Sequence, residues 1–103
     1  MNKTQSKQYQ IEILVKNKKI DLGEKYAYAV EANSQIKWFC KYPFTVQFDW
    51  DAPFRLLSKE AGSLIMEASA DPKPIYPYKY TIAVFFGDEV ISDDPIIIFP
   101  PER

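Results

Sequence analysis

Histidine is absent from the 103 residues of this chain. That absence excludes the Ser-His-Asp and Cys-His catalytic sets, an imidazole general base, and the zinc sites that use histidine. The single cysteine, Cys40, allows neither an intrachain disulfide nor a four-cysteine metal site. We therefore expect a protein that is not an enzyme and that binds no metal or other cofactor.

Long apolar runs and an excess of one charge are also missing. No segment approaches the roughly 18 apolar residues of a membrane span, and residues 1–10 lack the apolar core of a secretory signal. The formal net charge of -1 provides no field that would attract nucleic acid or an anionic membrane. We expect a cytoplasmic protein that binds neither nucleic acid nor membranes.

Aromatic residues, in contrast, are abundant. They make up 16% of the chain, and hydrophobic residues as a whole make up 47%. A chain of this length can bury roughly 60 to 70% of the surface that it exposes when unfolded, which suffices for one two-layer core. We predict a single domain over residues 8–103, preceded by a flexible polar arm over residues 1–7.

Apolar and polar residues alternate along several short segments, which is typical of half-buried strands. The clearest alternation covers residues 44–48, and residues 78–86 repeat it. Residues 54–61 are expected to form a helical turn or a loop, residues 64–68 a weak strand or a short helix, and the proline-rich residues 71–77 a loop. About seven short strands without a long amphipathic helix predict an all-β fold, a Greek-key antiparallel β-sandwich.

Two segments resemble the copper-binding strands of cupredoxins. Residues 36–48 follow the family outline of an aromatic strand, a short linker, then Pro-His and a Val-x-Phe strand, and residues 78–82, Tyr-Lys-Tyr-Thr-Ile, are similar to its Tyr-x-Phe-x-Cys strand. The resemblance implies a cupredoxin-like fold. It places Phe44 where the first histidine ligand would stand and Ile82 where the cysteine ligand would stand, so it implies the fold without the copper.

The end of the chain suggests a second resemblance. Its Tyr-x-Tyr followed by Asp-Pro-Ile-Ile-Ile-x-Pro is similar to small uncharacterised bacterial β-proteins that end in such a strand. An immunoglobulin-like sandwich is the alternative topology, because a count of strands does not separate it from a cupredoxin-like one.

Aromatic residues on the outward phase of strands are the first candidate functional feature. Phe39 and Phe85 alternate with apolar residues that supply the core, so we expect an exposed aromatic pair across a sheet face, and the phase of Phe54 also points away from the core. Exposed aromatics concentrate at protein interfaces. The leading hypothesis is a non-enzymatic module that binds a protein partner, or forms a homo-oligomer, through a sheet edge or an aromatic face.

A glycan or small-ligand binding module is the alternative, with aromatic rings as the platform. Its candidate residues are Trp50, Phe54, Tyr76 and Tyr78. Aromatics around a concave groove would favour this alternative, whereas a flat apolar patch at a sheet edge would favour a protein partner. An enzyme that uses carboxylates and tyrosine ranks below both, because the acidic residues stand in turn-forming segments where aspartate is common for structural reasons.

The absence of copper ligands can be tested directly. Because Phe44 and Ile82 supply neither imidazole nor thiolate, one equivalent of Cu(II) added to the purified protein should give no intense visible thiolate-to-copper band. Absorption spectra recorded during the titration provide the measurement. A strong band that saturates at one equivalent would refute the assignment.

Overall fold

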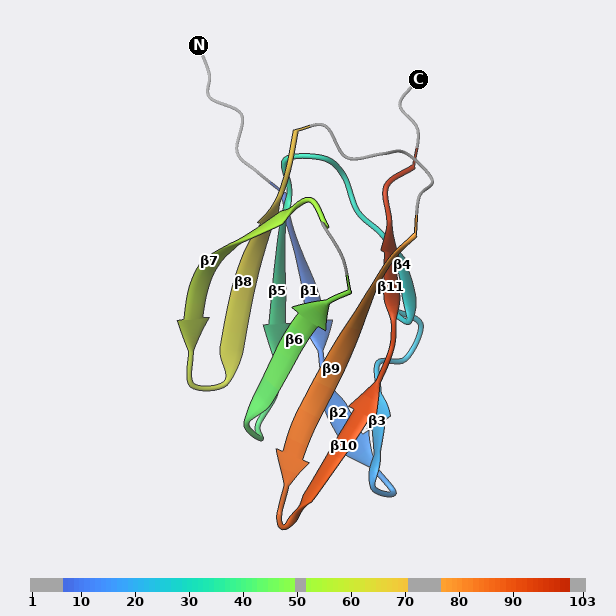
Figure 1. Ribbon diagram of the computed structural model, residues 1–103, viewed down its shortest axis with the longest axis vertical. Helices are drawn as coiled ribbons and strands as arrows, with labels where there is room; N and C mark the ends of the chain where they lie inside the picture. The colour runs from blue at the N-terminus through green and yellow to red at the C-terminus, as the bar shows by residue number, and fades with distance from the viewer. Residues whose placement is uncertain (1–6, 50–51, 71–76, 101–103) are drawn as a thin grey trace.

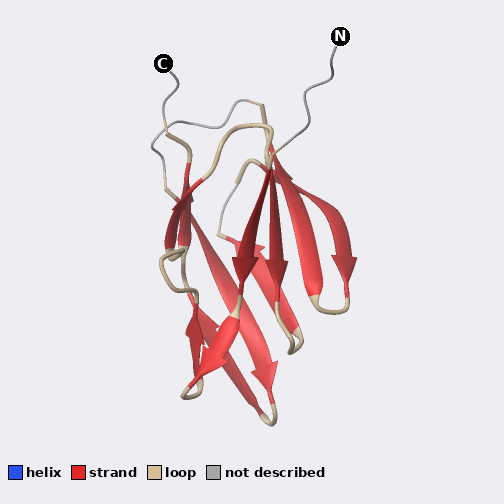
Figure 2. Ribbon diagram, turned by 180° about the vertical axis from the view of Figure 1, so that it is seen from behind, coloured by secondary structure: helices blue, strands red, loops and turns tan. Residues whose placement is uncertain are grey.

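The computed structural model describes residues 7–49, 52–70 and 77–100. Within these ranges the chain forms eleven strands and no helix, so the predicted all-β class is confirmed (Figure 1). Most of the strands belong to two sheets that pack against each other, and only strands and connecting segments are visible from the opposite side (Figure 2).

The first sheet has the order β1-β5-β8-β7. Its strands are β1 (Gln8–Glu12), β5 (Gln35–Phe39), β8 (Ser63–Ala68) and β7 (Phe54–Glu60). Strands β1 and β5 run parallel, and the other two pairings are antiparallel. Ile11, Trp38 and Leu64 lie side by side across this sheet and are all buried, so they form part of its core-facing surface.

The second sheet is built around β9 (Tyr78–Phe86), its longest strand. Strand β6 (Phe44–Phe48) pairs with it antiparallel, and so do β10 (Glu89–Asp93) and then β11 (Ile96–Ile98). The buried Pro95 lies between β10 and β11. Strand β4 (Ala27–Ala29) continues the sheet beyond β11 and is parallel to it.

A separate hairpin, β2 (Leu14–Lys16) and β3 (Lys19–Asp21), lies beside β10 at one end of the sandwich (Figure 1). Its two turn residues, Asn17 and Lys18, have φ angles of 53° and 61°. Positive φ at both positions is the geometry of the tight turn that matches the right-handed twist of a hairpin. An ion pair of 3.8 Å between Lys18 and Glu89 links the hairpin to β10.

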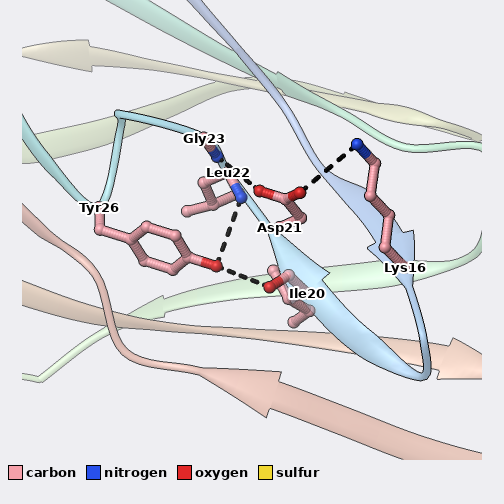
Figure 3. A network of polar contacts seen from close by, with 6 residues as sticks. All are labelled: Lys16, Ile20, Asp21, Leu22, Gly23 and Tyr26. Atoms are coloured by element: carbon pink, nitrogen blue, oxygen red, sulfur yellow. Dashed lines mark hydrogen bonds and ion pairs between the residues drawn. The ribbon is translucent and has the colours of Figure 1, made fainter.

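The segment that follows β3 is fixed by Tyr26 (Figure 3). The Tyr26 hydroxyl donates a hydrogen bond to the Ile20 carbonyl at 2.6 Å and accepts one from the Leu22 N–H at 3.4 Å. The Asp21 carboxylate accepts a bond from the Gly23 N–H at 2.8 Å. Burial raises the pKa of the Tyr26 phenol above its ordinary value. This network sets the direction in which the chain enters β4.

Several expectations from the sequence need correction. Residues 54–61 do not form a helical turn or a loop, because β7 spans Phe54–Glu60. For residues 64–68 the strand alternative is confirmed, because they lie in β8. The pairing of β7 shifts register between Leu56 and Ser58. Such a β-bulge breaks the period-two pattern by which strands are identified in a sequence. In the described ranges the strands number eleven rather than about seven, and two of their pairings are parallel.

The predicted N-terminal arm and the predicted proline-rich loop are only partly described. Residues 1–6 of the expected arm and residues 71–76 of the expected loop lie outside the described residues. Lys7, which the sequence assigned to the arm, already takes part in the fold, because its carbonyl accepts a hydrogen bond of 2.7 Å from the Gln35 N–H.

The core between the sheets is centred on Trp38 of β5 and Tyr80 of β9, both of which are 0% exposed. The Trp38 Nε1–H donates a hydrogen bond of 3.1 Å to the Tyr80 hydroxyl, and the ring centroids are 5.4 Å apart in an edge-on arrangement. Burial raises the pKa of Tyr80 far above its ordinary value, and the bond from Trp38 acts in the opposite direction to a smaller extent. One polar contact thus joins the two sheets inside an apolar core.

The predicted register of β6 and β9 agrees with the burial of their side chains. Phe44, Tyr80, Ile82 and Val84 are buried, and Gln47 is exposed. Two further residues predicted to face inward, Val46 and Phe48, are half-buried and pack against the core.

The register predicts different effects for two neighbouring positions. Phe48→Ala should lower the free energy of unfolding by about 3 kcal/mol, the lower end of the range for such truncations, because the Phe48 ring is half-buried. Gln47→Ala, on the outer face, should change it by less than about 0.5 kcal/mol. Urea denaturation of both variants measures the difference. Equal stabilities would mean that the register is shifted by one residue.

The buried contact between the sheets predicts a second effect. Tyr80→Phe leaves the Trp38 N–H without its acceptor and should lower the free energy of unfolding by about 1–3 kcal/mol. Tyr28→Phe, at a half-buried ring near the surface, is the matched control. The phenol of Tyr80 ionises near pH 10 only after unfolding, so its contribution to wild-type stability is present below about pH 10 and is lost above it. A pH series in urea should show a shallower alkaline loss of stability for Tyr80→Phe, and identical slopes would contradict the assignment.

Candidate interaction surface

Two of the predicted ligand-platform residues, Phe54 and Tyr78, belong to an aromatic cluster at the edge of the core. The Phe54 ring stacks on Phe48 with centroids 4.6 Å apart and on Phe99 with centroids 5.7 Å apart. Tyr78 meets the Phe54 ring edge-on at 6.4 Å. Both Phe54 and Tyr78 are half-buried and pack against the core, so the expectation that Phe54 points away from it is wrong.

This cluster has consequences for the ligand-binding alternative. A sugar platform needs an open ring face, and the stacked contacts of Phe54 use its face for packing within the protein. The other two residues of the expected platform, Trp50 and Tyr76, lie outside the described residues. The glycan alternative therefore stays a prediction.

Phe39 and Phe85 do not form a pair across one sheet face. Phe39 lies in β5 of the first sheet, and Phe85 lies in β9 of the second. Alternation along a strand correctly placed both rings on an outward phase, but it carries no information about which layer a strand joins. Phe39 is half-buried beside Glu12 and Ser63, whereas Phe85 is 44% exposed.

A row of apolar side chains crosses the outer face of the second sheet at Phe85. Val90 is its cross-strand partner in β10 and is 61% exposed. On the other side the Phe85 N–H donates a hydrogen bond of 2.9 Å to the Pro43 carbonyl, which brings Pro43 into the same row. Apolar side chains from β9, from β10 and from Pro43, which immediately precedes β6, thus form an exposed strip.

The next row along the strands is also uncharged. Thr45 lies opposite Ala83, and Ala83 lies opposite Ser92. We call the two rows together the β9 face. Its six residues are Pro43, Thr45, Ala83, Phe85, Val90 and Ser92.

The outer face of the first sheet differs in character. Lys37, half-buried, lies beside the exposed Gln10 in the row next to that of Phe39. Farther along, Arg55 of β7 forms an ion pair with Glu67 of β8. Charged groups therefore occupy this face, whereas the six residues of the β9 face carry no charge.

A hollow of about 470 Å³ lies next to the β9 face, where β6 begins. Pro43, Phe44 and Phe85 line it from the second sheet, and residues 59–64 of the β7–β8 hairpin line it from the first. It contains one basic and one acidic side chain, Lys59 and Glu60. The hollow therefore lies between the start of β6 and the β7–β8 hairpin, which belong to different sheets.

The chemistry of the described residues is limited. Cys40 is buried, and its sulfur accepts a hydrogen bond from the Tyr42 N–H at 3.4 Å. Over residues 7–49, 52–70 and 77–100, no three His, Cys, Asp or Glu side chains gather closely enough to hold a metal ion. The same part of the chain has no helix that is long and apolar enough to cross a membrane.

The two positions that the cupredoxin resemblance assigns to copper ligands lie in the core. Phe44 is opposite Val84 on β9, and Ile82 is opposite Val46 on β6. Phe44 and Ile82 are both buried. Both side chains therefore contribute to the apolar core.

Sequence reasoning missed the most exposed apolar residue of the surface, Val90, and two others on β7, Leu56 and Leu57. The phase of Val90 follows from the tight turn at Gly87, which has a φ of 65°, and this turn was the available signal. The β-bulge at Leu57 gives no such signal, because it is an irregularity in the pattern itself.

Comparisons with known proteins give no relative from which a function could be transferred. No protein-family model matches the chain, and no curated protein sequence matches it.

Proposed function

We propose that this chain is a non-enzymatic protein-interaction module that binds a protein partner or a second copy of itself through the β9 face and the adjoining edge of β6. The main observation in support is the β9 face. Its six residues come from neighbouring positions on β6, β9 and β10 and from Pro43, and none of them is charged. Two of them, Phe85 and Val90, are 44% and 61% exposed. Contiguous exposed apolar residues on a small domain are typical of a binding surface.

The shape of the surface favours a protein over a glycan. The β9 face consists of side chains from adjacent strands of one sheet. The side chains of its second row, such as Ala83 and Ser92, are small and uncharged. A sheet surface of this kind suits another protein surface, whereas sugar sites are concave and display ring faces. The described aromatic rings of the alternative platform are engaged in packing.

We further propose that the sandwich is a cupredoxin-like one without copper ligands. The immunoglobulin fold consists of two antiparallel sheets. Here β1 is parallel to β5, and β4 is parallel to β11. These pairings depart from the immunoglobulin pattern. Cytoplasmic location and the absence of a cofactor are part of the proposal and rest on the sequence.

Site-specific cross-linking tests the location of the surface. A photoreactive p-benzoylphenylalanine replaces Thr45 in the β9 face, and a second variant carries it at Gln10, an exposed control position on the first sheet. On irradiation in cells of the native host, the Thr45 variant should form adducts with a protein, and the Gln10 variant should form far fewer.

The masses of the adducts separate the two kinds of partner, since a second copy doubles the mass of the chain. Equal labelling from both positions, or no adduct from Thr45, would contradict the proposed function.

A further inference from the structure

The outer strands of a sheet carry unpaired backbone groups that can pair with another chain, and natural proteins protect them. In the first sheet, β7 is protected by its bulge at Leu57 and by charged Arg55, Lys59 and Glu60. Lys59 lies opposite the buried Leu64, so it is on the core-facing phase, and an inward-pointing lysine is one of the known devices against edge pairing.

Two further outer strands are protected in other ways. On β1, the Lys25 ammonium donates a hydrogen bond of 2.8 Å to the Gln10 carbonyl. The Gln35 N–H bonds to the Lys7 carbonyl, and the Ile13 N–H bonds to the Phe39 carbonyl. The backbone groups of odd-numbered residues along this part of the chain therefore face β5. Those of even-numbered residues, including the Gln10 carbonyl, face the open side. Strand β4 has only three residues, and a very short edge offers little to pair with.

The strand β10, which lies beside β3, carries an acid at each end, Glu89 and Asp93. Among the outer strands of the described chain, β6 is the exception. It has five residues, Phe-Thr-Val-Gln-Phe, with no charge and a regular pairing with β9. Pro43, which has no backbone N–H, precedes this strand. Because its carbonyl bonds to the Phe85 N–H, the backbone of Pro43 faces β9. The missing N–H is therefore on the β9 side, and the open side of β6 loses no donor.

The hydrogen bonds at the two ends of β6 define which of its backbone groups are available. Phe85 N–H bonds to the Pro43 carbonyl, and Asp49 N–H bonds to the Lys79 carbonyl. In an antiparallel ladder, hydrogen-bonded pairs alternate with pairs that are not bonded. The odd-numbered residues of β6 therefore bond to β9. The N–H and C=O groups of the even-numbered residues point to the open edge, namely those of Phe44, Val46 and Phe48.

Charges of opposite sign stand at the two ends of this uncharged strand. Lys41 precedes it and Asp49 follows it, and both are exposed. No Lys, Arg, Asp or Glu lies between them. When a strand pairs antiparallel with an identical strand, the start of each copy meets the end of the other. The basic end of one copy then lies beside the acidic end of the second at both ends of the pairing.

We infer that β6 pairs antiparallel with β6 of a second copy about a two-fold axis at Val46, which joins the second sheets of two molecules into one. In this register Val46 faces Val46, and Phe44 faces Phe48, so all six strand groups that point to the open edge find partners. The inference rests on the proposed function and names its partner as a second copy. A closed two-fold contact of this kind needs only one surface on the chain.

The register also positions the charged ends. Lys41 and Asp49 of the second copy become diagonal neighbours on the outer face, two residues from directly opposite. Asp49 of the second copy arrives beside Pro43, where the hollow contains Lys59 as well as Glu60. The two β9 faces come to lie on the same side of the joined sheet, which extends the uncharged surface.

Charge reversal tests the antiparallel arrangement. Lys41→Glu gives two acidic ends, and Asp49→Lys gives two basic ends, so each variant should associate with itself about tenfold more weakly than the wild type, by loss of two attractions and gain of two repulsions. An equimolar mixture of the two variants places opposite charges together at both ends. It should restore dimers at the wild-type affinity, and these should contain one copy of each variant.

Sedimentation equilibrium measures the affinities, and native mass spectrometry identifies the mixed dimer. Lys19→Glu is the matched control, because it makes the same change of charge on an exposed residue of β3 away from β6. It should leave the dimer affinity unchanged. Urea denaturation of each variant confirms that the fold is retained, which matters for Lys41 because its ammonium lies 5.4 Å from the centre of the Tyr42 ring.

A second measurement follows the backbone itself. The amide protons of Phe44, Val46 and Phe48 should exchange more slowly as the protein concentration rises through the dissociation constant, while those of Thr45 and Gln47, already bonded to β9, should not depend on concentration. Val46→Pro removes one donor from the open edge without removing a bond to β9, and it should weaken association.

Self-pairing is overturned if the wild type remains monomeric up to about 1 mM, or if the mixed variants associate no better than each variant alone. Such a result leaves the proposed function standing when the Thr45 cross-linker captures a different protein. If it captures nothing either, the proposed function fails as well, so the two failures are distinguishable.

Discussion

The contact between Trp38 and Tyr80 sets the arrangement of the whole sandwich. A buried indole N–H needs an acceptor, and that of Trp38 bonds to the Tyr80 hydroxyl of the opposite sheet at 3.1 Å. This fixes how β5 and β9 face each other, because a shift of either strand by one residue would turn its ring outward and leave a polar group unpaired. Both strands are interior strands of their sheets. The strands left at the outside, and therefore the surfaces on which function can depend, follow from this central pair.

The two lateral edges of the sandwich are treated differently. At one of them β1 and β4 meet, and the Tyr9 and Tyr28 rings close the gap edge-on at 5.6 Å, while Lys25 occupies a backbone acceptor of β1. At the other edge β6 and β7 separate around the hollow, and Leu56 is 54% exposed although its partner Met66 packs against the core. Aromatic rings also bridge the sheets at this second edge, because Phe48 of β6 stacks on Phe54 of β7 with centroids 4.6 Å apart, and the hollow lies at the other end of β6, where that strand begins. The two edges differ instead in the hollow and in the occupied backbone acceptor of β1, and both differences favour the β6 side for the proposed partner.

The sequence allowed the strand phases to be predicted wherever alternation is regular, which includes β6 and β9 and hence most of the core around Tyr80. It also placed Phe85 correctly on an outward phase. What alternation does not contain is the identity of the layer, so Phe39 and Phe85 were assigned to one face although they lie on different sheets. Parallel pairing of β1 with β5 is likewise invisible in the period of either strand, because it depends on contacts distant in sequence. A bulge such as that at Leu57 removes even the local signal, since two residues then occupy the space of one.

Strand β6 matters for association because the other outer strands of the described chain are protected against pairing with another molecule. With a net charge of -1 the chain has little electrostatic self-repulsion, so an open, uncharged edge would promote association in any register that it permits. Growth into an extended sheet requires two free edges on each molecule, however. The bulge of β7, the ammonium of Lys25 on β1 and the shortness of β4 remove the second one. An antiparallel pairing of β6 with itself then uses the single remaining edge of each copy and leaves none for a third molecule. In the proposed dimer, the protection of the other outer strands of the described chain therefore limits assembly to two copies, whereas an unprotected second edge would favour aggregation.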